Sequence, residues 1–566
     1  MQMKILWRRV AIGATAGALG SVALVAAVGN PLFSIVVGIV IGAAYSASLH
    51  PTRGAYVDNL MAAAALGVPL WAVVSVIALR FTGRQVPEWS AAQMRQDFPA
   101  LVGWILYGAA LGVIVQTLND AAERVLGPEP VSTTPGAAEK KRIVILGGGF
   151  AGMRVAQCLE ELLGASVSIT LISETNALLF TPMLAEVAGS SLEPSHITTP
   201  LRSSLRLTEF IRGRVAEIDL AARRVVLEGA TAGDGEDGRR KFAYDHVVLA
   251  LGSVANYLGM ANLEKYSFNF KSLLDAIRVR NHVIEMFERA DREPNPAIRR
   301  PILTFVIAGG GFAGVELAGA MNDFARGILA DYPNLRPEEL SIILVHSRDR
   351  VLPELSESLG RYAQAKMEAR GVSFRLNARL TDAQPGAVTL TDGQIAAHTL
   401  VWTAGTAPNP LLQLLQLERD KRGALVVDDS LAVPGHPGVW ALGDCAAVRD
   451  ARTAKPCPPT AQFALREAEV LARNIVAQLK GVPARKFHFD SLGALCVVGH
   501  QTACAELTIP FARNKTMRFS GLLAWFMWRG IYLSKLPGLE RKMRVLMDWT
   551  IELFFPRDIV QTIDLK

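Results

Sequence analysis

One glycine pattern occurs twice in the chain and constrains the fold more than any other feature. Its first copy, Gly147, Gly149 and Gly152, has the spacing G-x-G-x-x-G and directly follows the apolar run 143–146. The first glycine permits a tight turn, the second lets the backbone approach a pyrophosphate, and the third lets the next helix pack against the strand. Glu174 ends a second apolar run, 167–172, where an acid suits a ribose. These residues predict a strand–helix–strand unit that binds a dinucleotide.

The second copy repeats both the glycines and their flanks. Gly309, Gly311 and Gly314 lie within ILTFVIAGGGFAGVE, residues 302–316. A single copy also fits a glycine-rich turn of another α/β protein, whereas two copies predict two Rossmann-type domains. We expect FAD in the first and a nicotinamide cofactor in the second. Further strands are predicted at 247–251, 400–402, 425–427 and 439–442. The second unit interrupts the first, which resumes after about residue 405.

The first part of the chain differs in composition from the rest. Half of the 566 residues are hydrophobic and the mean hydropathy is +0.26, with the excess concentrated before about residue 120. Four apolar runs there, the last of them short, approach the length that spans a bilayer: 10–28, 31–49, 60–79 and 101–115. Residues 1–126 are therefore predicted to form a transmembrane helical domain of about four spans, and 127–140 a linker. A cleaved signal peptide is the alternative for the first run alone.

Charges around these runs predict their orientation. Lys4, Arg8, Arg9, Arg53 and Arg124 lie on one side, and Arg80, Arg84 and Arg95 lie on the other. The modest excess places the N-terminus and the α/β part on the cytoplasmic side of a multi-pass protein. His50 is the only histidine of the region, so no histidine pair is present to bind a haem. We expect an anchor or a surface for a membrane-protein partner.

Charge and cysteine content exclude several classes. The net charge of +7 fits attraction to membrane lipid, and no nucleic-acid-binding motif accompanies it. The five cysteines form no C-x-x-C, so neither a metal site nor a redox dithiol is predicted. A disulfide reductase is excluded on the same ground.

The C-terminal region, 511–566, changes composition again. Residues 522–528 are apolar and aromatic, and apolar residues recur at helical spacing through 539–554. Together with Trp525, Trp528 and Trp549, this pattern favours amphipathic helices that lie in a membrane interface. Packing on the protein's own core is the alternative.

Several motifs together resemble the type II NADH dehydrogenases, which are single-chain flavoprotein NADH:quinone oxidoreductases. The resemblance covers residues 140–566. Its motifs are KRIVILGGGFAG at 141–152, LLFTPMLAEVAG at 178–189, VIAGGGFAGVE at 306–316, GVWALGDCA at 438–446, PTAQFALREA at 459–468 and the tail 521–549. It implies FAD-binding segments at 141–265 and 406–510, the second with a quinone-site helix, an inserted nicotinamide domain at 266–405, and membrane attachment through 511–566.

The resemblance also implies roles for single residues. Those implied to bind FAD are Gly147, Gly149, Phe150, Ala151, Gly152, Glu174, Val215, Gly443, Asp444, Thr460, Ala461 and Gln462. Those implied to bind the nicotinamide nucleotide are Gly309, Gly311, Phe312, Ala313, Gly314, Glu316, His346, Arg348 and Gly405. Those implied to contact quinone are Ala461, Gln462, Leu465 and Arg466. Glu316 is the candidate catalytic residue, in a positioning role. FAD is expected to be non-covalent.

Two positions depart from the family's pattern. His346 and Arg348 follow the strand that often ends in an acid, so a 2′-phosphate could pair with Arg348 and NADPH remains open beside NADH. Arg466 and Glu467 replace a glutamine pair, and either form a local ion pair or change how the quinone head is held.

The function that follows is a membrane-bound NAD(P)H dehydrogenase. It would transfer hydride to FAD and electrons to a membrane quinone, without proton pumping as the resemblance implies. A sulfide:quinone oxidoreductase would need cysteines on both sides of the flavin, and none are apparent. A membrane-anchored redox sensor or scaffold is the alternative from a different class. A homodimer is left open.

Overall fold

The computed structural model describes residues 2–28, 30–48, 56–71, 74–75, 91–126, 140–229, 240–509 and 515–561. The chain divides into two compact units, Met1–Thr133 and Thr134–Lys566. Their boundary falls in the predicted linker, of which only Lys140 lies within the described residues. Four residues that bear on the predictions for the N-terminal part also lie outside the described residues. They are His50, which bears on haem binding, and Arg53, Arg80 and Arg84, which bear on membrane orientation.

The N-terminal unit consists of closely packed helices. They are α1 (Gln2–Val28), α2 (Pro31–Ser48), α3 (Tyr56–Leu70) and α5 (Ala91–Leu126). A Cβ at Gly17 of α1 would lie 2.0 Å from the carbonyl oxygen of Gly38 in α2, and one at Gly108 of α5 would lie 2.1 Å from that of Ala63 in α3. The small residues of these helices therefore let neighbouring helix backbones pack closely, as in pairs of membrane helices.

Two helices of the described part are long and apolar enough to cross a membrane. These segments are Trp7–Val25 and Pro99–Ala122, and Pro31–Ala47 is shorter. The short fourth run, 101–115, lies inside the longer helix α5, whose apolar segment extends over Pro99–Ala122. Part of the third run, 60–79, lies outside the described residues, and the prediction of about four spans is not confirmed. The unit exposes Val22, Val36, Val40 and Leu106.

The first Rossmann sheet of the second unit is fully parallel. Its strands are β1 (Arg142–Leu146), β2 (Ser168–Ser173), β5 (Glu209–Arg212), β9 (His246–Leu249) and β21 (Val439–Ala441). Their order is β21-β9-β1-β2-β5. Nearly all of their apolar side chains are buried, in one core shared with Val155 and Ile475 of two helices and with Val225 and Leu227 of an antiparallel strand. Strand β21 comes from far along the chain, so two separate segments build this domain.

The second sheet repeats this arrangement. Its strands are β11 (Phe268–Asn269), β12 (Thr304–Ala308), β13 (Ser341–Val345), β14 (Val372–Arg375) and β18 (Thr399–Trp402). Their order is β11-β18-β12-β13-β14, again parallel, with the glycine-bearing strand in the centre. Each domain also carries a three-stranded antiparallel sheet. These sheets are β6 (Val215–Asp219), β7 (Arg224–Leu227) and β8 (Lys241–Ala243), and β15 (Leu380–Gln384), β16 (Ala387–Leu390) and β17 (Gly393–Ala396).

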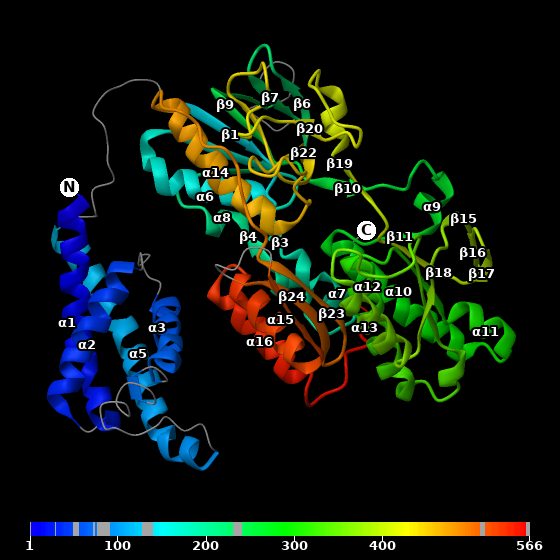
Figure 1. Cartoon of the computed structure of the whole chain (residues 1–566), viewed down its shortest axis with the longest axis horizontal. Coiled ribbons are helices and arrows are strands. Elements are labelled where there is room, and N and C mark those ends of the chain that lie inside the picture. Colours follow the sequence, from blue (N-terminus) through cyan, green and yellow to red (C-terminus); the bar gives the residue numbers. More distant parts are fainter. Residues whose placement is uncertain are drawn as a thin grey trace. The chain divides into compact units, whose positions relative to one another are not determined.

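A two-stranded ribbon joins the two domains. Strand β10 (Ser253–Ala255) pairs antiparallel with β19 (Thr406–Pro408), so the chain leaves the first domain and returns to it side by side (Figure 1). This confirms the predicted interruption. Leu263 of α9 (Ala261–Tyr266) packs with Val306 and Trp402 of the inserted domain. The inserted domain therefore begins at the ribbon, before the predicted residue 266.

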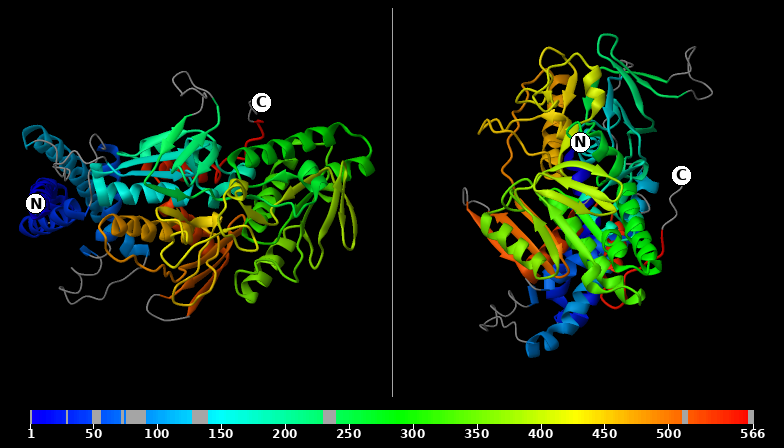
Figure 2. Two further views of the ribbon diagram at one scale, coloured as in Figure 1. Left: turned by 90° about the horizontal axis from the view of Figure 1, so that it is seen from above. Right: turned by 90° about the vertical axis from the view of Figure 1, so that its right-hand side faces the viewer.

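The C-terminal region combines a sheet with two helices. Strands β23 (Gly493–Gly499), β24 (Thr502–Thr508) and β25 (Thr516–Ser520) form an antiparallel sheet next to α15 (Gly521–Lys535) and α16 (Leu539–Ile551). These elements lie together in the views of Figures 1 and 2. The region therefore begins before the predicted residue 511.

The three tryptophans of this region do not face outward. Trp525, Trp528 and Trp549 are buried in the large core of the second unit, so their assignment to the membrane interface is wrong. The outward faces of the same helices are nevertheless apolar. The exposed side chains on these helices include Leu522, Leu523, Phe526, Met543, Leu546, Met547 and Ile551, and Phe554 and Phe555 are exposed just after α16. One face thus packs on the protein's own core and the other remains available to a membrane.

Candidate functional site

The first glycine loop has the geometry that a pyrophosphate needs. Gly147 has φ +108°, and a Cβ at Gly152 would lie 1.9 Å from the carbonyl oxygen of Gly147. Helix α6 (Phe150–Leu163) begins there, and none of the described side chains caps it. No described atom lies within 4 Å of a Cβ built at Gly149. The first N–H groups of α6 therefore face open space at the positive end of a helix.

The second glycine loop has nearly the same geometry. Gly309 has φ +117°, and a Cβ at Gly314 would again lie 1.9 Å from the carbonyl oxygen of Gly309. Helix α12 (Phe312–Ile328) begins there without a side-chain cap from the described residues. A Cβ at Gly311 would lie 3.4 Å from Oε1 of Glu354, which is ordinary contact. Phe312 is half-buried and Ala313 is exposed.

The second flavin motif lies directly against the first. Gly443 has φ +70°, and its Cβ would lie 3.5 Å from that of Ala151 at the start of α6. The next residue, Asp444, accepts a hydrogen bond of 2.6 Å from Ser253 Oγ. Lys271 Nζ donates to the same Ser253 Oγ at 2.5 Å and lies 3.9 Å from Asp444 Oδ2. Burial lowers the pKa of Lys271, and Asp444 opposes this shift. Sequence motifs gave no signal for Lys271.

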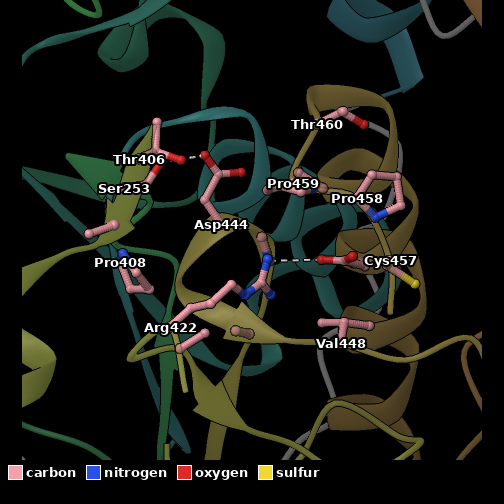
Figure 3. Close-up of a pocket in the computed structure, with 16 residues that line it drawn as sticks. Ser253, Thr406, Pro408, Arg422, Asp444, Val448, Cys457, Pro458, Pro459 and Thr460 are labelled. Carbon is pink, nitrogen blue, oxygen red and sulfur yellow. Dashed lines mark hydrogen bonds between the residues drawn. The ribbon is translucent and has the colours of Figure 1, made fainter. Parts of the chain in front are cut away.

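Helix α14 (Ala461–Leu479) completes this cleft. One pocket is lined by residues that include Asp444, Ser253, Thr406, Thr460 and Glu467 (Figure 3). None of the described side chains caps α14, so its first N–H groups are available to a ligand. An open helix start on α6, a second on α14 and a carboxylate between them fit the anionic and hydroxylated parts of FAD.

The predicted quinone residues lie at the start of α14. The side chain of Gln462 is already engaged, because its Oε1 accepts from Leu492 N at 3.0 Å and its Nε2 donates to Ser491 Oγ at 3.2 Å. Ala461 and Leu465 are half-buried, and Arg466 is exposed. Leu465 and Arg466 are therefore more available to a ligand than the amide of Gln462, which is already hydrogen-bonded.

Arg466 and Glu467 do not form the ion pair that one alternative predicted. Arg466 bonds to Glu469 at 3.1 Å and lies over the Phe489 ring. Glu467 turns the opposite way and accepts the Gly443 N–H at 2.7 Å. Burial raises the pKa of Glu467 to about 7, with Asp444 adding to the rise and the Gly443 N–H opposing it. Glu467, which departs from the family's pattern, is therefore in direct contact with the second flavin motif.

Glu174 lies where the sequence predicted it, at the end of β2. Its exposed carboxylate pairs with Arg214 at 3.2 Å. Val215, the next residue, begins β6 and is half-buried. These residues lie on the β2 side of the glycine loop, which is the ribose side in this fold.

His346 occupies the corresponding place after β13. Its Nδ1 accepts the Gly310 N–H at 3.1 Å, so the neutral ring carries its proton on Nε2. Burial lowers the pKa of His346, and Arg348 lowers it further. Arg348 is exposed, and its guanidinium contacts no carboxylate among the described residues. Gly405, with φ +101°, follows β18 at the carboxyl edge of the same sheet, and its Cβ would lie 3.6 Å from the carbonyl oxygen of Asn256 beside the ribbon.

Glu316 lies on a cavity behind the glycine loops. Its Oε1 accepts the Val497 N–H at 3.3 Å. Burial raises the pKa of Glu316 to about 8, and Glu186 adds to the rise. Glu186, on α7 (Leu184–Ala188), accepts from Trp549 Nε1 at 3.0 Å, and burial raises its pKa to about 7. Both carboxyl groups line the same cavity.

A cation closes the other side of this cavity. Arg529 lies between the rings of Trp525, at 3.8 Å, and Trp549, at 4.6 Å, and pairs with Glu552 at 3.2 Å. Sequence reasoning missed Glu186 and Arg529 as site residues. Both lie inside quoted motifs, LLFTPMLAEVAG and the tail, but their burial depends on contacts between distant segments.

No group of three metal-ligating side chains occurs among the described residues. All five cysteines are free, although Cys496 and Cys504 lie opposite each other on β23 and β24. Burial raises the pKa of Cys504 to about 12 and that of Cys496 well above its usual value, so both stay thiols.

Comparisons with known proteins agree with this geometry. The family model described as pyridine nucleotide-disulphide oxidoreductase matches residues 141–468, and the NDH2 C-terminal domain matches 492–558. The type II NADH:quinone oxidoreductase Ndh of Mycobacterium tuberculosis is 31% identical over 447 residues, which cover 76% of this chain and 91% of that protein. The external alternative NADH-ubiquinone oxidoreductase of Yarrowia lipolytica is 26% identical, covering 76% and 82%.

The chain belongs to the type II NADH:quinone oxidoreductase family.

Solved structures show the same fold. NDH2 from Plasmodium falciparum, in complex with NADH, superposes with a TM-score of 0.67 at 18% identity, covering 75% of this chain and all of that one. The sulfide:quinone oxidoreductase of Aquifex aeolicus shares the architecture with a TM-score of 0.56 at 17% identity, covering 73% and 95%. In this type II family member, the family-model matches begin at residue 141, after the N-terminal unit.

Proposed function

We propose that the protein is a membrane-bound NADH:quinone oxidoreductase. NADH would bind the inserted domain, FAD the interrupted domain, and quinone the start of α14. The observation that carries this proposal is the meeting of two flavin motifs, Gly443 against Ala151, in one cleft beside a second, intact nucleotide loop. The relatives carry the same activity in their names, NADH:quinone and NADH-ubiquinone oxidoreductase.

The chain's own residues would hold FAD in a defined way. The open start of α6, Phe150–Gly152, would bind the pyrophosphate, and Glu174 a ribose hydroxyl pair. Asp444, oriented by Ser253, would accept a hydroxyl of the ribityl chain. The start of α14, Thr460–Gln462, would favour negative charge on the reduced ring. Bound FAD supplies the hydride acceptor and the electron donor to quinone.

The inserted domain would bind the nicotinamide nucleotide and orient it. The open start of α12 would hold its pyrophosphate, and Glu316 would act as a positioning residue. His346 and Arg348 follow β13 where the family often has an acid, and the guanidinium of Arg348 is exposed, so we include NADPH beside NADH as a substrate.

Membrane attachment is proposed for both ends of the chain. The outward apolar faces of α15 and α16 would lie in the lipid interface, so that quinone enters near α14 from the bilayer. The N-terminal helices would span the membrane more than once, with the catalytic part on the cytoplasmic side. They contain no redox-group ligands among their described residues, and we propose that they act as an anchor or a partner surface, without proton pumping.

Steady-state assays of the purified full chain test this function. NADH oxidation should accelerate on adding menadione or a ubiquinone analogue, and the bound flavin should leave the polypeptide on acid precipitation. Binding of FAD and NADH without turnover with any quinone would instead support a redox sensor. In parallel, Arg348→Ala should lower kcat/KM for NADPH about tenfold and leave that for NADH unchanged.

A further inference from the structure

Glu467 is a buried acid whose contact crosses from the α14 helix to the flavin motif. It lies on the second turn of α14, is 3% exposed, and accepts the Gly443 N–H at 2.7 Å. Gly443 has φ +70° and is followed by Asp444, the carboxylate assigned to the ribityl chain. A change in the charge of Glu467 therefore acts on the backbone that carries Asp444.

The charged groups around Glu467 do not neutralise it. Asp444 and Glu467 line the same pocket, and Asp444 raises the pKa of Glu467. Arg422 and Cys457 also line this pocket, but Arg422 pairs with Asp420 at 3.2 Å, and burial raises the pKa of the Cys457 thiol to about 12. Two cations on neighbouring elements are engaged with other partners. Lys271 bonds Ser253, and Arg154 of α6 pairs with Glu469 at 3.0 Å.

We propose that Glu467 is a positioning residue that couples the binding of FAD to the uptake of one proton. This inference rests on the proposed FAD site. FAD is an anion, and its entry removes water from a pocket that already holds two carboxyl groups, so the neutral form of Glu467 is favoured when the cofactor is bound. A protonated carboxyl still accepts the Gly443 N–H through its carbonyl oxygen, so the loop keeps its conformation.

The direction of the pH dependence follows from the starting state. Without FAD, burial places the pKa of Glu467 at about 7, and FAD would raise it further. Below pH 7 the carboxyl is already protonated and binding takes up no proton. Above pH 7 binding must take one up, so the FAD dissociation constant rises with pH, by up to about tenfold per pH unit.

The experiment measures FAD release from the full-length holoenzyme. Serial dilution at pH 6.5, 7.5 and 8.5 frees the flavin, and its recovered fluorescence gives the dissociation constant. The wild type should release FAD with a constant that increases roughly tenfold from pH 6.5 to 8.5. Glu467→Gln keeps the acceptor for Gly443 and removes the charge, so its constant should stay flat across this range.

Glu469→Gln is the matched control. Glu469 lies on the same helix but points away from Gly443, toward Arg154 and Arg466, so this variant should keep the wild-type pH dependence. Glu467→Ala, which loses the acceptor altogether, should bind FAD more weakly at every pH. A flat wild-type profile, or a slope that persists in Glu467→Gln, would overturn the coupling. A wild type that holds no FAD would instead overturn the proposed function.

Discussion

Three glutamates close to the proposed binding sites have buried carboxyl groups. Glu467 contacts the flavin motif, whereas Glu316 and Glu186 share the cavity under the C-terminal helices. Each has a pKa raised mainly by burial, to about 7, 8 and 7 respectively. Groups that titrate near neutrality make both stability and activity depend on pH.

Glu316 should make the protein less stable as pH rises. Burial raises the pKa of Glu316 from 4.5 to about 8, so between these pH values the folded protein keeps a proton that the unfolded chain has released. Stability therefore falls as pH rises towards about 8 and stays constant above it. We expect the Tm of the wild type to fall about 2–4 °C more between pH 6.5 and 9 than that of Glu316→Gln. Differential scanning fluorimetry at constant ionic strength measures this. Equal falls in both proteins would place the titrating group elsewhere.

The two glycine loops allow a paired substitution. Gly311→Val should leave FAD bound and raise the KM for NADH at least tenfold, because its side chain enters the nucleotide space and otherwise meets only Glu354. Gly149→Val should do the reverse and yield protein without flavin. Both glycines are in extended backbone that any residue adopts, so neither change strains the fold. Flavin absorbance per chain and NADH kinetics distinguish the two. Loss of flavin in Gly311→Val would mean that the sites are exchanged.

At the scale of elements, the C-terminal helices have one face in the protein core and one exposed apolar face. Their inner faces place Trp528 and Trp549 in the core and hold Glu186 and Arg529 beside the cavity. Their outer faces remain apolar. Apolar residues that recur every 3.6 residues predict a helix with two different faces, but they do not tell whether each face contacts protein, lipid or water. The alternative of packing on the core is therefore confirmed for the inner face, and membrane contact of the outer face stays a prediction.

Charged substitutions on the outer face should separate binding from catalysis. The double variant Phe526→Glu and Met547→Glu should sediment less with anionic vesicles, since both side chains are more than half exposed. NADH oxidation with a soluble dye should be unchanged, and reduction of a membrane quinone should fall several-fold. Trp549→Phe, on the inner face, is the comparison, since it should lower Tm and leave vesicle binding intact. Full vesicle binding by the double variant would contradict the assignment of this face.

The sequence could predict features that depend on residues close together in the chain, but not those that depend on contacts between distant residues. Strand positions, the interruption of one domain and the glycine loops follow from short motifs and were confirmed. The destination of Glu467 could not be predicted, because its partner Gly443 is distant in the chain. The same holds for the burial of Trp525, Trp528 and Trp549, which depends on contacts with distant segments.

At the scale of the molecule, the two compact units predict a simple truncation. Deleting residues 1–128 should leave a folded flavoprotein, because the second unit holds both Rossmann sheets and its own core. The truncated protein should keep hydride transfer to a soluble dye and bind membranes with greater salt sensitivity. Flavin content, dye reduction and sedimentation at two salt concentrations measure this. A truncated protein that binds FAD but reduces no dye would show that the N-terminal helices help to build the active site.

The matching strand order of the two domains suggests how the chain originated. Each sheet has the glycine-bearing strand at its centre, each carries a three-stranded antiparallel sheet, and each loop makes the same 1.9 Å approach. This is the pattern left when one ancestral gene segment is duplicated and the copy is inserted into the first. The ribbon β10–β19 then marks the insertion point. An ancestor with a single unit would have bound one dinucleotide, and the transfer of electrons between two cofactors would have arisen with the duplication.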